Sequence, residues 1–136
     1  MAGYSGTPLP KKLGIKEGSA FTVSAAPPGF SEALGELPAG AVAIEPGAGP
    51  AAVAVVFVTT LAQLGAVLPE AMRWIGQDGG LWIAWPKRAS GVATDLSENI
   101  IRELGLATGM VDNKVCAIDD TWSGLRFVIR LRDRKR

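Results

Sequence analysis

The apolar positions along this chain form short unbroken runs, separated by glycine, proline and charged residues. The longest run, residues 51–58, contains only Ala, Val and Phe. A short run without polar alternation predicts a strand that is buried on both faces, as at the centre of a parallel sheet. Further strands are predicted at residues 20–25, 41–45, 81–85 and 115–118.

Helical spacing is clearest after residue 94. Asp95 with Glu98 three positions later forms a capping-box pattern, which predicts a helix that begins near Leu96. Gly105 is predicted to end this helix. The apolar positions share one face and the charged positions take the other. The apolar face comprises Leu96, Ile100, Ile101 and Leu104.

A second capping-box pattern, Thr60 with Gln63, predicts a helix through Leu68. Proline is well placed as a first helical residue, so Pro69 predicts a separate helical piece over residues 69–77. Shorter helical segments are predicted over residues 11–18 and 30–37.

The C-terminal segment alternates between apolar and polar positions after a turn at residues 121–124. One side collects Leu125, Phe127, Ile129 and Leu131. This alternation predicts a strand that pairs antiparallel with the strand before it. Taken together, the elements predict a three-layer α/β fold with a Rossmann-like, mostly parallel sheet that ends in an antiparallel C-terminal hairpin. We expect a single domain over residues 1–136.

The connection between the second and third strands is short. Five residues separate Glu45 from Ala51, whereas a crossover helix needs about a dozen. Either these two strands run antiparallel, or the connector crosses the sheet in a stretched conformation. We favour the stretched crossing, because it preserves a Rossmann-like order from which one β-α unit has been deleted.

Several segments resemble one family. They are MAGYSGTPLPKKLGIK at the start, WPKR at residues 85–88, TDLSE at 94–98 and VDNKVCAIDDTWSGL at 111–125. These segments are similar to a family of small bacterial proteins known only as a domain of unknown function, number three thousand and fifty-two. This resemblance spans nearly the whole chain but implies no activity. The layout from residue 77 onwards also resembles the second half of Rossmann-like methyltransferases, which end in an antiparallel strand pair.

Charge and composition narrow the function classes. The formal net charge is +1, so we do not expect a nucleic-acid partner. Six of the 14 Lys and Arg residues lie between Arg126 and Arg136, and residues 131–136 are predicted to form a basic tail. Residues 1–10 are predicted to form a flexible N-terminal arm. They lack a signal-peptide core, and no apolar run approaches the roughly 20 residues of a membrane span. A soluble cytoplasmic protein with no membrane association is expected.

Residue types limit the chemistry. The sequence contains no histidine, so no Ser-His-Asp, Cys-His or zinc-type site can be assembled. The one cysteine, Cys116, lies in an apolar strand and is predicted to be a buried structural thiol. Asp119 and Asp120 are adjacent, so on a strand they would point to opposite faces, and we interpret them as turn formers. No catalytic residue and no metal site are predicted.

The loop after the first predicted strand is where a dinucleotide cofactor would be expected to bind. A dinucleotide loop needs glycines so that the backbone can approach the ligand, but this exit reads SAAPPGF, with two prolines that lack amide donors. Glu45 ends the second strand, where related folds keep a ribose-binding carboxylate. Without the loop it is interpreted as a solvated strand end, and no cofactor is expected.

Two candidate sites remain. Lys87 and Arg88 follow a rigid Trp-Pro pair and could bind an anion beside Asp119, or form an ion pair with Asp119 or Asp120. Trp122, Arg126, Arg130 and Arg132 could form an interaction surface. The leading interpretation is a non-catalytic interaction or regulatory module whose partner is another protein or a second copy. The alternative is a small-molecule or anion-binding protein, with or without enzyme activity, whose site lies around Lys87.

Overall fold

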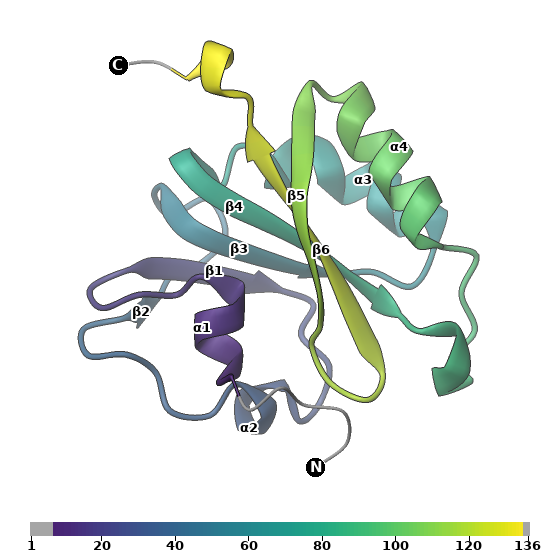
Figure 1. Cartoon of the computed structure of the whole chain (residues 1–136), viewed down its shortest axis with the longest axis horizontal. Helices are drawn as coiled ribbons and strands as arrows, with labels where there is room; N and C mark the ends of the chain where they lie inside the picture. Colours follow the sequence, from purple (N-terminus) through teal and green to yellow (C-terminus); the bar gives the residue numbers. More distant parts are fainter. Residues whose placement is uncertain (1–6, 135–136) are drawn as a thin grey trace.

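The structure is a computed structural model that describes residues 7–134, and its centre is a six-stranded sheet (Figure 1). The strands are β1 (Ala20–Ser24), β2 (Val42–Ala43), β3 (Ala51–Phe57), β4 (Ile75–Pro86), β5 (Met110–Ala117) and β6 (Trp122–Ile129). The helices are α1 (Leu9–Leu13), α2 (Phe30–Leu34), α3 (Leu61–Ala71) and α4 (Glu98–Ala107). Short 3₁₀ turns cover η1 (Arg88–Ser90) and η2 (Leu131–Asp133).

The sheet has the strand order β2-β1-β3-β4-β6-β5. The pairs β1–β2, β1–β3 and β3–β4 are parallel, whereas β4–β6 and β5–β6 are antiparallel. The predicted fold class is therefore confirmed, including the C-terminal hairpin. The unbroken apolar strand β3 lies inside the sheet between β1 and β4, and six of its seven residues are buried.

The crossing from β2 to β3 joins parallel strands, as favoured from the sequence, but it is not stretched throughout, because it contains a turn in which the Ala48 amide donates to the Glu45 carbonyl at 3.0 Å. Both strands run parallel to β1, and the connector Ile44–Pro50 contains no helix. Because β1 lies between β2 and β3, the connector has to cross two strand spacings of about 5 Å each. It steps back only a short way along the strands, because β2 is only two residues long. Seven residues can span about 23 Å, so the connector is long enough.

The two faces of the sheet carry separate cores. The α3/α4 face packs residues such as Leu64, Leu68 and Ile101 against β3 and β4. The α1/α2 face packs Leu9, Leu13 and Phe30 on the opposite side, and Figure 1 shows α3 and α4 beside each other and apart from α1 and α2.

Two tryptophans of β4 confirm the predicted alternation between the faces. Trp82 is fully buried on the α1/α2 face, where its indole Nε1 donates to the Leu13 carbonyl at 2.9 Å. Trp85, 6% exposed, lies on the α3/α4 face. The sheet is thus covered on both sides, which makes it the middle of three layers.

The cap of α4 differs from the prediction. Helix α4 begins at Glu98, and the Ser97 hydroxyl accepts from the Ile100 amide at 3.3 Å. Asp95 instead accepts from the Leu61 amide at 2.8 Å, so it caps the start of α3. The prediction of a helix was correct, but the residue chosen as its cap serves a neighbouring helix 34 positions earlier.

The predicted separate helix over residues 69–77 is wrong. Pro69 lies inside α3, near its C-terminal end, and the chain is extended from Ile75 onwards. Residues 76–79 form an irregularity in the ladder between β3 and β4, because Ala51 pairs with Ile75 while Val53 pairs with Gly80. Glycines suit this irregularity, and a Cβ on Gly79 would meet the Ala51 carbonyl at 2.7 Å.

Gly105 does not end α4, which continues to Ala107. It is buried in the helix beneath the ring of Phe127, and a Cβ at this position would overlap that ring. The glycine therefore allows close packing of α4 on β6.

The chain ends also differ from the prediction. Most of the predicted arm, residues 1–6, lies outside the described residues, but Leu9 and Pro10 are buried in α1. In the predicted tail, residues 131–133 form η2, and residues 135–136 lie outside the described range. No helix among residues 7–134 is long and apolar enough to cross a membrane.

Candidate functional site

The carboxyl ends of β1, β3 and β4 share one edge of the sheet, because these strands are parallel. Ligands of open α/β sheets usually bind beyond this edge. The loops that leave this edge have very different structures.

The exit of β1 is rigid and poor in amide donors. Ala25 adopts a positive φ of 58°, and Gly29, with φ 89°, precedes α2. Pro27 and Pro28 between them carry no amide hydrogen. The helix that follows has only five residues. Few backbone donors therefore converge here.

Aromatic packing closes this exit on the α1/α2 face. The Phe30 and Phe57 rings meet edge to face with centroids 5.0 Å apart. Phe57 meets Trp122 in the same way, also at 5.0 Å. Phe30 and Phe57 are each 5% exposed. The three rings fill the space between the ends of β1, β3 and β6.

The exit of β3 is held by hydrogen bonds. The Gln63 side-chain oxygen accepts from the Thr59 amide at 2.7 Å, and the Thr60 hydroxyl accepts from the Gln63 amide at 3.1 Å. This pattern confirms the predicted start of α3 at Thr60. The Thr94 hydroxyl donates to the Thr59 carbonyl at 2.6 Å, which ties the loop after β4 to this exit.

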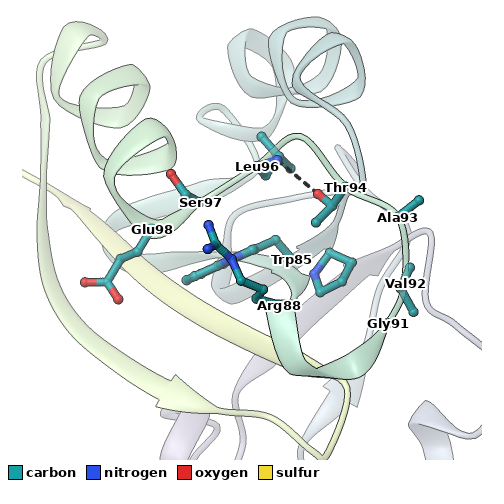
Figure 2. Close-up of a pocket in the computed structure, with 10 residues that line it drawn as sticks. Trp85, Arg88, Gly91, Val92, Ala93, Thr94, Leu96, Ser97 and Glu98 are labelled. Carbon is teal, nitrogen blue, oxygen red and sulfur yellow. Dashed lines mark hydrogen bonds between the residues drawn. The ribbon is translucent and has the colours of Figure 1, made fainter.

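The exit of β4 surrounds a hollow of about 420 Å³. The hollow lies on the α3/α4 face and is lined by Trp85, Arg88, Val92, Thr94, Leu96 and Glu98, among others. Figure 2 shows Arg88 reaching from the loop after β4 towards the start of α4, where Ser97 and Glu98 lie. We name this site the β4 hollow.

Some charged side chains around the β4 hollow form ion pairs, whereas Arg88 forms none within the described range. Glu98 forms an ion pair with Arg102 at 2.6 Å, and Arg102 also contacts Asp112 at 2.9 Å. These two carboxylates raise the pKa of Arg102. Arg88 is exposed, and its side chain makes no hydrogen bond or ion pair with any residue in the range 7–134. Arg88 is therefore the cation available to a ligand in the hollow.

Lys87 and Asp119 lie near this exit but are used differently. The Lys87 amide donates to the Thr121 carbonyl at 2.7 Å, so the start of the loop is tied to the hairpin between β5 and β6. The Asp119 carboxylate accepts from the Thr121 and Trp122 amides, both at 2.8 Å, which is the predicted turn. Within the described range, neither Lys87 nor Arg88 forms an ion pair with Asp119 or Asp120.

The four residues of the predicted interaction surface do not form one patch. Trp122 and Arg132 lie at opposite ends of β6, and Trp122 packs on Phe57. The Arg130 Nε donates to the Gly109 carbonyl at 3.0 Å. Arg132 is exposed, with a long 3.9 Å contact to Asp133. Arg126 is half-buried, and its Nη1 donates to the Asn113 side-chain oxygen at 3.3 Å.

Cys116 is half-buried rather than buried, because β5 is an edge strand of the sheet. Partial burial raises the pKa of its thiol, although Lys12 and Lys114 act in the opposite direction. The thiol is therefore not activated, which agrees with a structural role. Residues 7–134 contain no group of three acidic or cysteine side chains that could hold a metal ion.

Known proteins share the fold but little sequence. A scan of family models and a search of curated proteins gave no match. Among solved structures, a Sulfolobus solfataricus protein named as a candidate type 11 methyltransferase is 12% identical, with a TM-score of 0.54, over 87% of this chain and 88% of that one. At this identity, the similarity shows the fold alone, which is a Rossmann-like α/β fold.

Two further structures are similar over 91% of this chain and 47% of their own length. One is a pericyclic reaction enzyme, with 12% identity and a TM-score of 0.49. The other is LepI in complex with SAM, with 13% identity and a TM-score of 0.48. These weaker similarities add nothing to the fold assignment.

The residues at the β1 exit do not fit a nucleoside cofactor. The fold class places such a group beside the loop after β1, where bare backbone has to approach the ligand. Here Pro27 and Pro28 occupy that loop, and the Phe30 ring turns inwards onto Phe57. Glu45 follows β2 and is exposed.

Sequence patterns missed the β4 hollow as a cavity, although they identified Arg88 beside it. Its walls depend on the path of residues 91–97, and that path is held by Asp95 and Thr94 contacts to another element. The sequence feature that pointed to this site was a pair of charged residues after Trp85-Pro86, followed by a glycine-containing loop.

Proposed function

We propose that this chain is a non-catalytic binding protein for a small anionic molecule, which it holds in the β4 hollow. One observation supports the proposal above all: the hollow contains an exposed guanidinium, Arg88, that no residue in the described range neutralises. The proposed site is the loop that the sequence singled out, and Arg88 rather than Lys87 is proposed as the principal cation.

The lining of the hollow suggests the ligand's shape. Trp85 and Leu96, 6% and 7% exposed, offer apolar walls, and Arg88 offers a planar pair of donors. A carboxylate or phosphate on a compact apolar body would satisfy both. Lys87 would contribute long-range attraction, while Asp119 would hold the adjoining turn through its bonds to Thr121 and Trp122.

A binding role without catalysis is supported by residue chemistry. The sequence has no histidine, and the exit of β1 carries prolines where a cofactor loop would need open backbone. Such a module would act in regulation, with another protein or a second copy as its partner. Membership of the resembled bacterial family and a cytoplasmic location are also part of this proposal and rest on the sequence features alone.

The test is a titration of benzoate, a carboxylate on an apolar ring, into the full chain by calorimetry. Benzoate should bind the wild-type protein, and the neutral analogue benzamide should not. Arg88→Gln should weaken benzoate binding by about tenfold or more, because a charge-assisted pair is lost.

Arg73→Gln is the matched control, because Arg73 is exposed just beyond the C-terminal end of α3. Its affinity for benzoate should stay within about twofold of the wild type. Absence of wild-type binding, or equal weakening in both variants, would contradict the proposal.

A further inference from the structure

Two half-buried arginines, Arg102 on α4 and Arg126 on β6, have opposite electrostatic surroundings. Arg102 reaches two carboxylates, Glu98 and Asp112. Arg126 on β6 has one side-chain partner in the described range, the neutral Asn113 oxygen at 3.3 Å. Burial lowers the pKa of Arg126, and the nearby charge of Arg134 lowers it further. A cation in this environment lacks its counter-charge.

The backbone makes room for this guanidinium. Gly80 lies on β4, the strand that pairs with β6. A Cβ at Gly80 would overlap the Arg126 Nε and lie 2.6 Å from both Cζ and Nη2. The guanidinium therefore rests against the sheet where a side chain is missing, and any residue other than glycine would displace it.

The surrounding charges are mostly positive. Lys114 is the cross-strand neighbour of Arg126, and its ammonium donates to the Lys12 carbonyl at 3.3 Å. The Arg134 Nε donates to the Ile129 carbonyl at 2.9 Å, and its Nη1 lies 3.6 Å from Asp78. The Arg134 side chain is 24% exposed, whereas that of Asp78 is 92% exposed.

These contacts fix the arginines but leave a charge surplus. Lys114, Arg126 and Arg134 carry three positive charges and Asp78 carries one negative charge, so these four residues have a formal surplus of two positive charges. The Asp78 carboxylate is far more exposed than Arg134, so solvent screens its charge strongly. An anion of charge near −2 would match this surplus.

We propose that Arg126, Arg134 and Lys114 form a site for a phosphate dianion, either inorganic phosphate or the phosphate group of a small molecule. A phosphate monoester carries about −1.5 to −2 charges at neutral pH. Guanidinium groups bind its oxygens in pairs. The site lies on the α1/α2 face, away from the β4 hollow, because Arg126 pairs with Trp82 on that face.

The test is calorimetric titration of inorganic phosphate into the full chain at low ionic strength. Wild-type protein should bind phosphate, and Arg126→Gln should weaken binding by about tenfold or more. Arg126→Lys keeps the charge but loses the paired donors, so its affinity should fall between the two. Circular dichroism would establish that both variants fold.

Two controls separate this site from other effects. Arg132→Gln removes an equal charge from a side chain that is 78% exposed, and it should change phosphate affinity by less than about twofold. Arg126→Gln should bind benzoate as tightly as the wild type does, so failure here is distinguishable from failure of the benzoate site.

Three outcomes would overturn the proposal. One is no phosphate binding by the wild type at millimolar concentrations. Another is the same loss of affinity in Arg132→Gln as in Arg126→Gln, which would indicate diffuse charge attraction. The third is binding of a single-stranded oligonucleotide through Arg126 without binding of inorganic phosphate, which would assign the surface to a polyanion instead.

Discussion

The exits of β1 and β4 lie on the same edge of one sheet but have opposite structures. The β1 exit is closed by prolines and by the rings of Phe30 and Phe57, which are almost fully buried. The β4 exit is an open loop around a hollow with one cation, Arg88, whose side chain has no partner among residues 7–134. Packing therefore holds the first exit, and hydrogen-bonded caps hold the second. A Rossmann-like sheet can therefore keep the same carboxyl-end edge while the space open to a ligand lies at the exit of β4 instead of the exit of β1.

Removal of the Phe57 ring, which contacts both Phe30 and Trp122, should have the largest effect on stability. Phe57→Ala leaves a cavity between Phe30 and Trp122, so the free energy of unfolding should fall by about 3–5 kcal/mol. Urea denaturation monitored by tryptophan fluorescence measures this loss. Val92→Ala at the open exit, where the side chain is 42% exposed, should cost less than about 0.5 kcal/mol. A loss below about 1 kcal/mol for Phe57→Ala would mean that packing does not close the β1 exit.

Removal of a cap should have an intermediate effect. Asp95→Ala leaves the Leu61 amide without its acceptor and should lower the free energy of unfolding by about 0.5–2 kcal/mol. Ser97→Ala should act similarly on α4.

The double variant tests which helix each residue caps. Because Asp95 and Ser97 cap different helices, their losses should add within about 0.5 kcal/mol in denaturation measurements. A double variant no less stable than Asp95→Ala alone would support the cap predicted from the sequence pattern, with both residues acting on α4.

Neutralisation of the free cation should leave stability almost unchanged. Arg88→Gln removes no interaction within the described residues, so the free energy of unfolding should stay within about 0.5 kcal/mol of the wild type. The same urea titration provides the measurement. A larger loss would show that Arg88 supports the fold, and the contrast between the exits would then weaken.

Titration of a cofactor should produce no effect at all. Calorimetry with S-adenosylmethionine or NAD should give no binding signal, because Pro27 and Pro28 stand where backbone would have to approach the ligand. Low-micromolar binding of either compound would contradict both the closed β1 exit and the proposed function.

The sequence was most informative where local pattern and fold agree. The unbroken run at residues 51–58 placed β3 inside the sheet, and the opposite parity of Trp82 and Trp85 placed them on different faces. These features depend on the alternation of apolar and polar residues and on burial, and both can be inferred from the residues of a single strand.

The remaining features depend on distant partners. Gly105 has the residue type of a helix stop, yet Phe127 on a later strand decides that it serves packing. Asp95 has the residue type of a cap, and only the folded chain shows that its partner is Leu61. The β4 hollow and the cluster of Arg126, Arg134 and Lys114 likewise need side chains from several elements. Sequence pattern alone does not show that these side chains are neighbours.

The brevity of β2 has a consequence for solubility. An outermost strand that exposes a long row of free amides and carbonyls invites pairing with another molecule, and short or irregular outer strands reduce that hazard. Here one border of the sheet is only two residues long, and the other, β5, is interrupted between Asp112 and Lys114. Both borders thus give a neighbouring chain little regular backbone to extend, which protects the folded protein against growth into larger aggregates.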